Sequence, residues 1–337
     1  MKIIAIETSS DGTSVAIVEN GRKILANIVA SSADMHAKTG GIIPEQAARQ
    51  QVVSIIPVLS EALKSAGLDH NQIDKIAVTT SPGLIGSLLV GIETARTLSL
   101  IWNKPIIPVN HLIAHLYANW LMEGEEPQFP AVAMVVSGGH TDIIMMNYHN
   151  DIEWIGGTRD DAAGEAFDKT ARLLGLPYPG GPAIGKSAQE YIDNNPNDKL
   201  NYFPRPLLGD NNYDLSFSGL KTAVLRESEK KIMDNRKLAA EVQEAIIDVL
   251  VGKTIKAVEE YKPKSLLLAG GVSANGRLAD RFRKETENIK STNFFIPPPK
   301  LCTDNAAYIA SCAFYNQRET DPFEIDATAD LSITGQV

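Results

Sequence analysis

The stretch that begins at residue 2 reads KIIAIETSSDGTSVAIVENGRKILANIV and ends at Val29. It consists of three short apolar runs separated by two turns. The first turn, over 9–12, is polar, and the second contains the pair Asn20-Gly21, a strong signal for a β-hairpin. Short apolar runs between such turns are typical of β-strands. The stretch therefore predicts three consecutive strands, over residues 2–6, 13–18 and 23–29.

A second passage, which begins at Ala131, repeats this plan. An apolar run over 131–136 leads into the tight turn Ser137-Gly-Gly-His140, and two further apolar runs follow. In both halves the chain continues with an apolar strand, a Gly-rich turn and a helix, over 73–96 and again over 265–283. Strands that alternate with helices predict an α/β fold with mixed sheets. The repeated order predicts a duplicated domain, with chance recurrence of strand–helix units as the alternative.

The predicted boundary between the halves lies near Gln128. It gives an N-terminal half over 1–128 and a C-terminal half over 129–337. The second half carries additional helical sequence, at about 162–261. The C-terminal segment can also return to the first half as a helix.

The composition limits the location and the partners of the protein. Asp and Glu number 41 against 32 Lys and Arg, which gives a formal net charge of −9 and disfavours non-specific binding to nucleic acid. A nucleic-acid partner therefore needs a local basic patch, and the densest basic stretch lies between Lys221 and Lys237. A solvated helix face is the alternative for that stretch. The two cysteines exclude a disulfide framework, Glu7 interrupts the first apolar run, and no apolar stretch approaches the length of a membrane span, so the sequence predicts a cytoplasmic protein.

A candidate metal site is contained in Asn110-His-Leu-Ile-Ala-His115, directly after an apolar run. On a helix, His111 and His115 lie one turn apart on one face and can reach one metal ion. Asp304 opens the corresponding helix of the second half, so the duplication predicts that it supplies a third ligand. Two imidazoles and one carboxylate leave coordination positions open, as in a catalytic or ligand-binding metal site. The alternatives are two ordinary histidines and an Asp304 that caps its helix.

Four Gly-rich turns predict a nucleotide site. They occur at 8–13, 137–141, 180–181 and 270–275. Such turns let backbone N–H groups approach phosphate oxygens, although glycines also occur in plain hairpins. None is a Walker motif, which excludes a P-loop enzyme. Asp161, Glu165 and Asp168 share one helical face by their spacing, and Asp168 is the candidate for accepting ribose hydroxyls, with a solvated acidic face as the alternative.

These residues together resemble the bacterial tRNA adenosine threonylcarbamoyltransferases, a family long called glycoproteases. The resemblance covers nearly the whole chain. The motifs that carry it are Ile6-Glu-Thr-Ser9, Met35-His36 with Gly40-Gly41 and Pro44-Glu45, Gly83-Leu-Ile-Gly86, the His111/His115 pair, Val136-Ser-Gly-Gly-His-Thr141, Asp161-Ala-Ala-Gly-Glu-Ala-Phe-Asp-Lys169, Tyr178-Pro-Gly-Gly-Pro182, Phe217-Ser-Gly-Leu-Lys-Thr222, Gly270-Gly-Val-Ser-Ala-Asn275 and Cys302-Thr-Asp-Asn305.

The resemblance implies a duplicated actin-like ATPase fold, of the sugar kinase and Hsp70 type, with two similar halves around a nucleotide cleft. It implies that His111, His115 and Asp304 hold one divalent metal ion, iron(II) or zinc. It also implies a site for an ATP- or AMP-type nucleotide or threonylcarbamoyl-AMP. The residues implied to line that site are Val136, Ser137, Gly138, Gly139, His140, Asp168, Gly181 and Asn275.

The implied activity is an acyl transfer in tRNA modification. The threonylcarbamoyl group moves from threonylcarbamoyl-AMP to the exocyclic amine of the adenosine beside the anticodon, in tRNAs that read codons starting with A, and AMP is released. The implied partners are tRNA, a degenerate paralogue of the same fold (TsaB-like), a small ATPase (TsaE-like) and a separate threonylcarbamoyl-AMP synthase. His140 and Asp11 are the candidates for a general base.

The chain departs from the family pattern at four positions. Gly12 stands where an acidic residue is usual, Gln51 where a histidine is common, Ile113 where an acidic residue separates the two histidines, and Gly185 where an aspartate is frequent. None of these positions is a predicted metal ligand. Gly12 and Gly185 put in doubt an acidic contact near the phosphates or the threonyl group.

Two other classes of function remain as alternatives. A zinc metalloprotease of the His-Glu-x-x-His type needs a glutamate directly after the first histidine, and this chain has Leu112 there. A non-catalytic scaffold, like the degenerate paralogue, should lack the metal ligands, and this chain retains all three.

Overall fold

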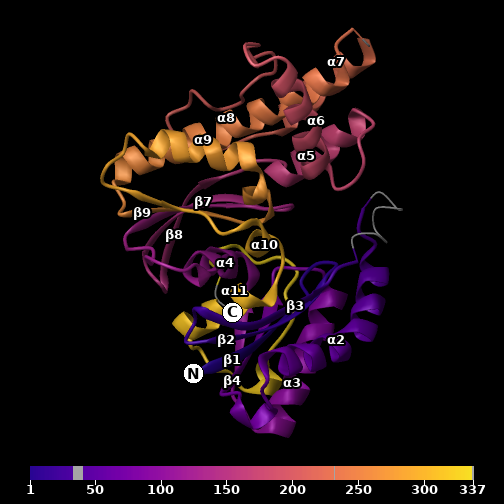
Figure 1. Cartoon of the computed structure of the whole chain (residues 1–337), viewed down its shortest axis with the longest axis vertical. Helices are drawn as coiled ribbons and strands as arrows, with labels where there is room; N and C mark the ends of the chain where they lie inside the picture. The colour runs from indigo at the N-terminus through magenta and orange to yellow at the C-terminus, as the bar shows by residue number, and fades with distance from the viewer. Residues whose placement is uncertain (33–40, 231, 336–337) are drawn as a thin grey trace. The chain divides into compact units, whose positions relative to one another are not determined.

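The computed structural model describes residues 1–32, 41–230 and 232–335. The motif residues Met35, His36 and Gly40, and Lys231 of the basic stretch, lie outside the described residues. The chain forms two compact units. The first consists of Met1–Glu126 and Pro297–Val337, and the second of Pro127–Ile296 (Figure 1).

The first unit is built on a five-stranded sheet in the order β3-β2-β1-β4-β5. Its strands are β1 (Lys2–Glu7), β2 (Thr13–Glu19), β3 (Lys23–Ala30), β4 (Lys75–Ser81) and β5 (Ile106–Asn110). β1 pairs antiparallel with β2 and parallel with β4, and β4 pairs parallel with β5. The three strands predicted from the opening stretch are confirmed.

The second unit repeats this topology, with the strand order β8-β7-β6-β9-β10 when it is read from the corresponding edge. Its strands are β6 (Ala131–Val136), β7 (Thr141–Tyr148), β8 (Asp151–Gly157), β9 (Ser265–Ala269) and β10 (Asn293–Phe295). β6 pairs antiparallel with β7 and parallel with β9, as β1 does with β2 and β4. The identical order and direction of pairing in two sheets confirm the predicted α/β fold and its duplication.

The helices of the first unit pack against its five-stranded sheet. They are α2 (Pro44–Ala66), α3 (Ile85–Trp102), α4 (His111–Tyr117), α10 (Pro299–Cys302) and α11 (Ala306–Asn316), with the 3-10 turns η1 (His70–Gln72), η2 (Ala118–Leu121) and η4 (Pro322–Glu324). α2 buries Ile55, Val58 and Leu59 in the core that strands β1, β2 and β4 share with α3. α2 is not among the elements predicted above.

The last helix corrects the predicted domain division. The second half is predicted to run to residue 337, whereas Pro297–Val337 belong to the first unit. The cause is α11, in which every residue from Ala306 to Ala313 is buried. A helix that is apolar on all sides needs cover on all sides, and α11 finds it against β1, β2 and α4. The other boundary, predicted near Gln128, lies between Glu126 and Pro127.

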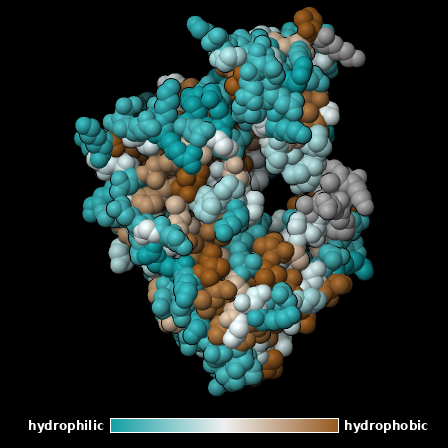
Figure 2. Space-filling model, in the orientation of Figure 1, coloured by the Kyte–Doolittle hydropathy of each residue, from teal (hydrophilic) through white to brown (hydrophobic). Residues whose placement is uncertain are grey.

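Four helices lie between β8 and β9, in the range where the sequence predicts a helical insertion. They are α5 (Ala163–Leu173), α6 (Gly180–Asn194), α7 (Ser218–Lys230) and α8 (Asn235–Tyr261), and the 3-10 turn η3 (Gly271–Ala274) and α9 (Gly276–Thr286) follow β9. Their apolar side chains form one core with alternate residues of β6, β7 and β9. The face shown in Figure 2 is mostly hydrophilic where these helices lie in Figure 1, with scattered apolar patches.

α3 departs from the expectation that no apolar stretch reaches the length of a membrane span. Its 18 residues are long and apolar enough to cross a membrane by length and composition alone. The helix packs on β4, and its residues Leu88, Ile92 and Ala95 are buried in the core of the first unit. Core helices of globular units pass the same test of composition, so α3 is weak evidence for a membrane span.

We expect Gly91→Ala to destabilise the protein by about 1–3 kcal/mol, because overpacking of a tight contact costs that much. A Cβ atom at Gly91 of α3 would lie 2.4 Å from Thr8 Oγ1. Alanine has the higher helix propensity, so a purely local effect would stabilise the helix instead. The matched control is Gly219→Ala on α7, where the nearest atom to an added Cβ is 3.9 Å away. Chemical denaturation that shows equal stability for both variants would contradict the close contact.

Candidate functional site

α4 presents the two histidines in the way that their spacing predicts. The helix follows β5 directly, and Asn110 caps it by accepting hydrogen bonds from Leu112 N (2.9 Å) and Ile113 N (3.3 Å). The cap fixes the start of the helix at His111, so His111 and His115 lie one turn apart. Their ring centroids are 4.5 Å from each other.

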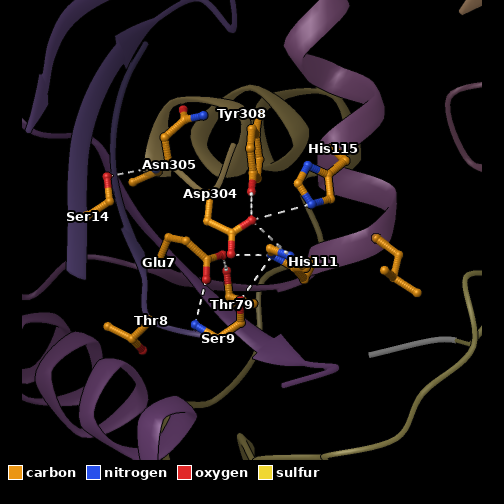
Figure 3. Close-up of polar contacts among 12 residues, drawn as sticks. Glu7, Thr8, Ser9, Ser14, Thr79, His111, His115, Asp304, Asn305 and Tyr308 are labelled. Carbon is orange, nitrogen blue, oxygen red and sulfur yellow. Dashed lines mark hydrogen bonds and ion pairs between the residues drawn. The ribbon is translucent and has the colours of Figure 1, made fainter. Parts of the chain in front are cut away.

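Asp304 lies beside the two histidines and comes from the turn between α10 and α11. Its Oδ1 is 3.6 Å from His111 Nε2 and 3.6 Å from His115 Nε2. The cap of α11 is Asn305, whose side chain accepts a hydrogen bond from Ala307 N (3.1 Å). This removes the alternative in which Asp304 serves as the cap. Figure 3 shows the Asp304 carboxylate pointing toward both imidazoles.

The geometry of these three side chains fits a metal ion. One ligand atom from each of His111, His115 and Asp304 can be chosen so that all three lie within 4.8 Å of one another. Ligand bonds to imidazole and carboxylate are about 2.0–2.2 Å long, which places a single ion between atoms at such separations. Two imidazoles with one carboxylate suit zinc and non-haem iron(II) and leave positions open for other ligands. All three residues belong to the first unit.

Glu7 is the residue of this site that the sequence did not reveal. Its Oε2 lies 3.1 Å from His111 Nδ1, and Thr79 Oγ1 donates to the same carboxylate oxygen. Ser9 N donates to Glu7 Oε1 at 2.6 Å. A carboxylate on one ring nitrogen fixes the ring so that the other nitrogen faces a metal. The available signal was a lone acidic residue at the end of an otherwise apolar strand.

The Glu7–His111 pair shifts both pKa values. Burial would lower the pKa of His111, but the charges of Glu7 and Asp304 and the hydrogen bond that Glu7 accepts from His111 outweigh it and raise the pKa to about 9. Burial would raise the pKa of Glu7, and the charge of His111 with the hydrogen bonds from His111, Ser9 and Thr79 lowers it instead. The metal-free site therefore holds a buried ion pair.

Asp304 responds differently to the same surroundings. Burial, with the charges of Glu7 and Asp11, raises the pKa of Asp304, while His111 opposes the rise. Tyr308 of α11 donates a hydrogen bond to Asp304 Oδ1 at 3.4 Å. Glu7 and Asp304 both act on the single His111 imidazolium, and Asp11 adds negative charge near Asp304. A divalent cation would compensate this excess of negative charge.

A small pocket borders this cluster on the side of the loop between β1 and β2. It is lined by Glu7, Ser10, Gly12, Thr13, Ser14, Val29 and Asp304. Gly12 replaces the acidic residue that is usual in the family pattern, and a Cβ there would meet only Ala30 O, at 3.8 Å. Asp11, one of the two predicted bases, belongs to this loop and accepts a hydrogen bond from Ser10 Oγ at 3.4 Å. Its role as a base stays a prediction.

The second unit contains the turn Ser137-Gly-Gly-His140, which is closed by hydrogen bonds from Ser137 N to His140 O (2.9 Å) and from His140 N to Ser137 Oγ (3.2 Å). Two other glycines pack against it. A Cβ at Gly164 of α5 would lie 2.5 Å from Ser137 O, and a Cβ at Gly270 would lie 2.4 Å from Val136 O. Gly270 also has a positive φ of 92°, which disfavours other residues. The predicted turns at 137–141 and 270–275 therefore meet.

Asp168 joins the Gly180-Gly181 turn to this group. Its Oδ1 accepts a hydrogen bond from Gly180 N at 2.7 Å, at the start of α6. Burial raises the pKa of Asp168, and the N–H groups of Gly180 and Gly181 oppose the rise. The other two members of the predicted acidic face, Asp161 and Glu165, both pair with Lys169, at 2.6 and 2.8 Å. Lys169 compensates both charges. Asp161 lies before the first residue of α5, so the predicted helical face holds only for Glu165 and Asp168.

Asn275 holds the start of α9. Its Oδ1 accepts a hydrogen bond from Leu278 N (3.1 Å), and its Nδ2 donates to Gln243 Oε1 (3.0 Å). Gly185 faces this amide pair, because an added Cβ would lie 3.6 Å from Gln243 Oε1 and 3.7 Å from Asn275 Nδ2. Gly181 precedes Gly185 by one turn of α6. The predicted nucleotide residues of the second unit thus lie on neighbouring turns, and Gln243 is an addition to them.

The basic stretch is less positive than its sequence indicates. Lys230 pairs with Glu227 at 2.7 Å, Arg236 with Asp234 at 2.8 Å, and Lys237 with Asp198 at 2.8 Å. Neighbouring carboxylates therefore compensate three of its cations. This favours the alternative of a solvated helix face.

Solved structures with the same fold define the class of the protein. The chain is similar to HypF from T. kodakarensis, with a TM-score of 0.64 and 12% identity over 94% of this chain and 47% of that chain. It spans about half of that protein. It is also similar to the activator of the 2-hydroxyisocaproyl-CoA dehydratase from Clostridium difficile, solved with bound ADPNP, with a TM-score of 0.53 and 14% identity over 94% and 95% of the two chains. The fold is that of the actin-like ATPases and sugar kinases.

Closer relatives share the sequence as well as the fold. The family model described as tRNA N6-adenosine threonylcarbamoyltransferase matches residues 23–311. Proteins of that name from Thermomicrobium roseum and Bacillus subtilis are 48% and 47% identical to the chain. The matches cover 94% of this chain and 92% of the first relative, and 92% and 89% for the second. The chain belongs to the tRNA N6-adenosine threonylcarbamoyltransferase family.

We expect metal binding to strengthen as the pH rises towards 9. His111 must lose its Nε2 proton to bind a metal, and its pKa is raised to about 9. Displacement of one proton should increase the apparent affinity about tenfold per pH unit below that pKa. Calorimetry with zinc between about pH 6.5 and 8.5, in buffers of different ionisation enthalpy, measures the affinity and the released proton.

The metal-free protein should show the opposite trend in stability. The contribution of the His111 ion pair to the free energy of unfolding is present below the ordinary histidine pKa of 6.5 and is lost as the pH rises through about 9.

Metal binding that releases no proton and does not vary with pH would contradict the assignment of His111 as a ligand.

Proposed function

We propose that this chain transfers the threonylcarbamoyl group from threonylcarbamoyl-AMP to the exocyclic amine of the adenosine next to the anticodon, in tRNAs that read codons starting with A. The observation that carries the proposal is membership of the family over nearly the whole chain, together with retention of His111, His115 and Asp304 in one cluster. The products are modified tRNA and AMP.

The reaction is an acyl transfer at the carbamoyl carbon. The adenine amine forms a C–N bond to that carbon, the bond from the carbon to the phosphate oxygen breaks, and AMP leaves with the electron pair. The amine gives up one proton. Because an aromatic amine is a weak nucleophile, correct placement of both substrates should provide much of the rate.

The turns of the second unit are the proposed nucleotide site. The residues are Val136, Ser137, Gly138, Gly139, His140, Asp168, Gly181 and Asn275. An added Cβ at Gly138, Gly139 or Gly181 would meet no atom within 4 Å, so the backbone there is open to a ligand. Gln243 joins this set through its bond to Asn275. Backbone N–H groups in such turns favour anionic oxygens, and the Asp168 carboxylate suits ribose hydroxyls.

The proposed metal ligands are His111, His115 and Asp304, with iron(II) as the expected ion and zinc as the alternative. A bound divalent ion would stabilise negative charge on phosphate oxygens. Glu7 holds the His111 ring in the orientation that such binding needs. His140 and Asp11 remain the two candidates for the base that accepts the amine proton.

The alternatives have less support. Leu112 occupies the position where a metalloprotease of the His-Glu-x-x-His type requires its glutamate. The nearby acid, Glu7, is engaged by His111, Ser9 and Thr79. A non-catalytic scaffold would not need the three metal ligands. Both alternatives predict that no threonylcarbamoyl group is transferred to tRNA.

We expect His111→Ala with His115→Ala to reduce transfer by at least about 100-fold, because loss of a metal or of its charge stabilisation costs on that order. The assay measures incorporation of labelled threonine into tRNA from threonylcarbamoyl-AMP, with and without the partner proteins. Circular dichroism and metal analysis accompany it.

His70→Ala is the matched control, since His70 is an exposed histidine of the 3-10 turn η1. It should keep both metal and activity. Normal transfer by the double variant would remove the metal role, and absence of transfer by the intact protein with all partners would remove the proposed function.

The proposed partners besides tRNA are a degenerate paralogue of the same fold, a small ATPase and the synthase that makes threonylcarbamoyl-AMP. An apolar surface of the first unit supports a protein partner of this kind. It is formed on the packed helices α2 and α3 by Val52, Val53, Ile56, Ile85 and Leu89, which are 62%, 68%, 61%, 43% and 42% exposed. Exposed apolar side chains grouped on neighbouring helices are typical of interfaces. We also propose that the protein acts in the cytoplasm.

Val53→Asp with Ile56→Asp should abolish the complex with the paralogue, because the variant places two charges in an apolar interface. Gel filtration of the mixed proteins measures the complex. The matched control is Ser60→Asp, which adds a charge to an exposed polar position of the same helix. A complex of unchanged affinity in the double variant would show that the partner uses another surface.

A further inference from the structure

Gln51 is a polar side chain fully buried in the first unit. It lies on α2, has 0% exposure, and stands on the face of the helix that also buries Ala47 and Ile55. A buried amide is costly unless its donors and acceptors are bonded. Its contacts therefore indicate what the residue does.

The Gln51 amide holds the loop between β1 and β2. Its Nε2 donates to the carbonyl oxygens of Thr8, Ser10 and Gly12, at 3.3, 3.0 and 2.7 Å. The amide has this orientation because the opposite one would place Oε1 against three other acceptors. Among the described residues, Gln51 Oε1 is buried with no hydrogen-bond partner. The contacts with the loop thus outweigh the cost of an unsatisfied oxygen.

The opposite side of the loop faces the metal-ligand cluster. In a trans peptide the N–H points away from the C=O of the preceding residue, and no peptide between residues 8 and 13 is among the cis bonds. Carbonyls 8 and 10 point to Gln51, so the N–H groups of Ser9 and Asp11 point away from it. Ser9 N accordingly donates to Glu7 Oε1 at 2.6 Å, and Ser9 Oγ lies 3.3 Å from His111 Nδ1.

The carbonyl of Ser9, which lies between two carbonyls bonded by Gln51, has its own hydrogen-bond donor. Ser9 O accepts a hydrogen bond from Leu84 N at 2.8 Å. Gly83 lies so close to the loop that a Cβ there would be 2.6 Å from Ser9 O. With carbonyls 8, 9, 10 and 12 all engaged, the backbone of the loop is held at four points, and the Asp11 N–H points away from Gln51.

We propose that Gln51 is a positioning residue that sets the 8–12 loop for ligand binding. Its hydrogen bonds hold the carbonyl groups of the loop on one side. The Asp11 N–H, with Ser10 and Gly12 of the pocket lining, is then available to an anionic oxygen of the substrate. The proposal rests on the proposed function, in which the ligand is an acyl adenylate. Gln51 touches no reacting atom and acts only through the loop.

Gln51→Met tests the proposal, because methionine has the same length without a branch and without a donor. Two measurements are made on the full chain: the KM for threonylcarbamoyl-AMP and for tRNA, and hydrogen exchange of the amides of residues 8–12. We expect the KM for the adenylate to rise about tenfold or more, as for the loss of about one strong ligand contact, with the KM for tRNA unchanged. Exchange at residues 10–12 should become faster.

Gln50→Met is the matched control, since Gln50 is the neighbouring exposed residue and forms hydrogen bonds with Ser54 within the helix. It should leave both measurements at the values of the unaltered protein. Gln51→Asn has a side chain that is one methylene shorter and should change the KM and the loop exchange in the same direction as Gln51→Met. It replaces Gln51→Met as the test if the methionine variant does not fold. Unchanged loop exchange and unchanged KM in a folded Gln51 variant would overturn the proposal.

The outcome is separable from that of the proposed function. If the unaltered protein transfers no threonylcarbamoyl group, the KM cannot be measured, and the affinity for AMP, determined by calorimetry, replaces it. Weaker AMP binding and faster loop exchange in Gln51→Met would then support the role of Gln51. Equal AMP affinity and equal exchange would overturn it.

Discussion

The contact between Glu7 and His111 ties together the elements on which the first unit depends. Glu7 ends β1, Thr79 of β4 and Ser9 of the following loop donate to its carboxylate, and His111 opens α4. Through His111 the contact extends to Asp304 at the start of α11. A buried carboxylate is tolerable only when charge and hydrogen bonds compensate it. The elements must therefore meet at this point, and β1 and β4 of the core sheet anchor the cluster.

What the sequence predicted correctly was mostly local. Hairpin turns at Asn20-Gly21 and Ser137-Gly-Gly-His140 specify neighbouring strands, and the spacing of His111 and His115 needs only one helical turn. The sequence allowed the C-terminal segment to return to the first half as a helix but did not locate the boundary at residue 297, because a buried helix has no polar face to indicate which sheet it covers. Glu7 was missed because a charge inside an apolar run is ambiguous until its partner is known. That partner is about a hundred residues distant, at His111.

The two sheets share their topology but differ in the chemistry at the same place in the fold. The turn after β1 is pinned by side chains, with Gln51 on one side and Glu7 on the other. The turn after β6 is held mainly by close backbone approach, with Gly164 and Gly270 packed against it. Carboxylate and imidazole side chains cluster beside the turn after β1, whereas glycine backbone predominates at the turn after β6. The same scaffold thus supports a cluster of possible metal ligands in one copy and a glycine-rich turn in the other.

The position of Asp304 affects how the protein is made. His111 and His115 leave the ribosome well before Asp304, with the whole second unit synthesised in between. The first sheet also lacks the cover of α11 until that helix has been synthesised. The second unit is continuous in the sequence and can fold while the first still waits for its last helix. A chain that stops before residue 304 therefore lacks a complete cluster, even where its second unit has already folded.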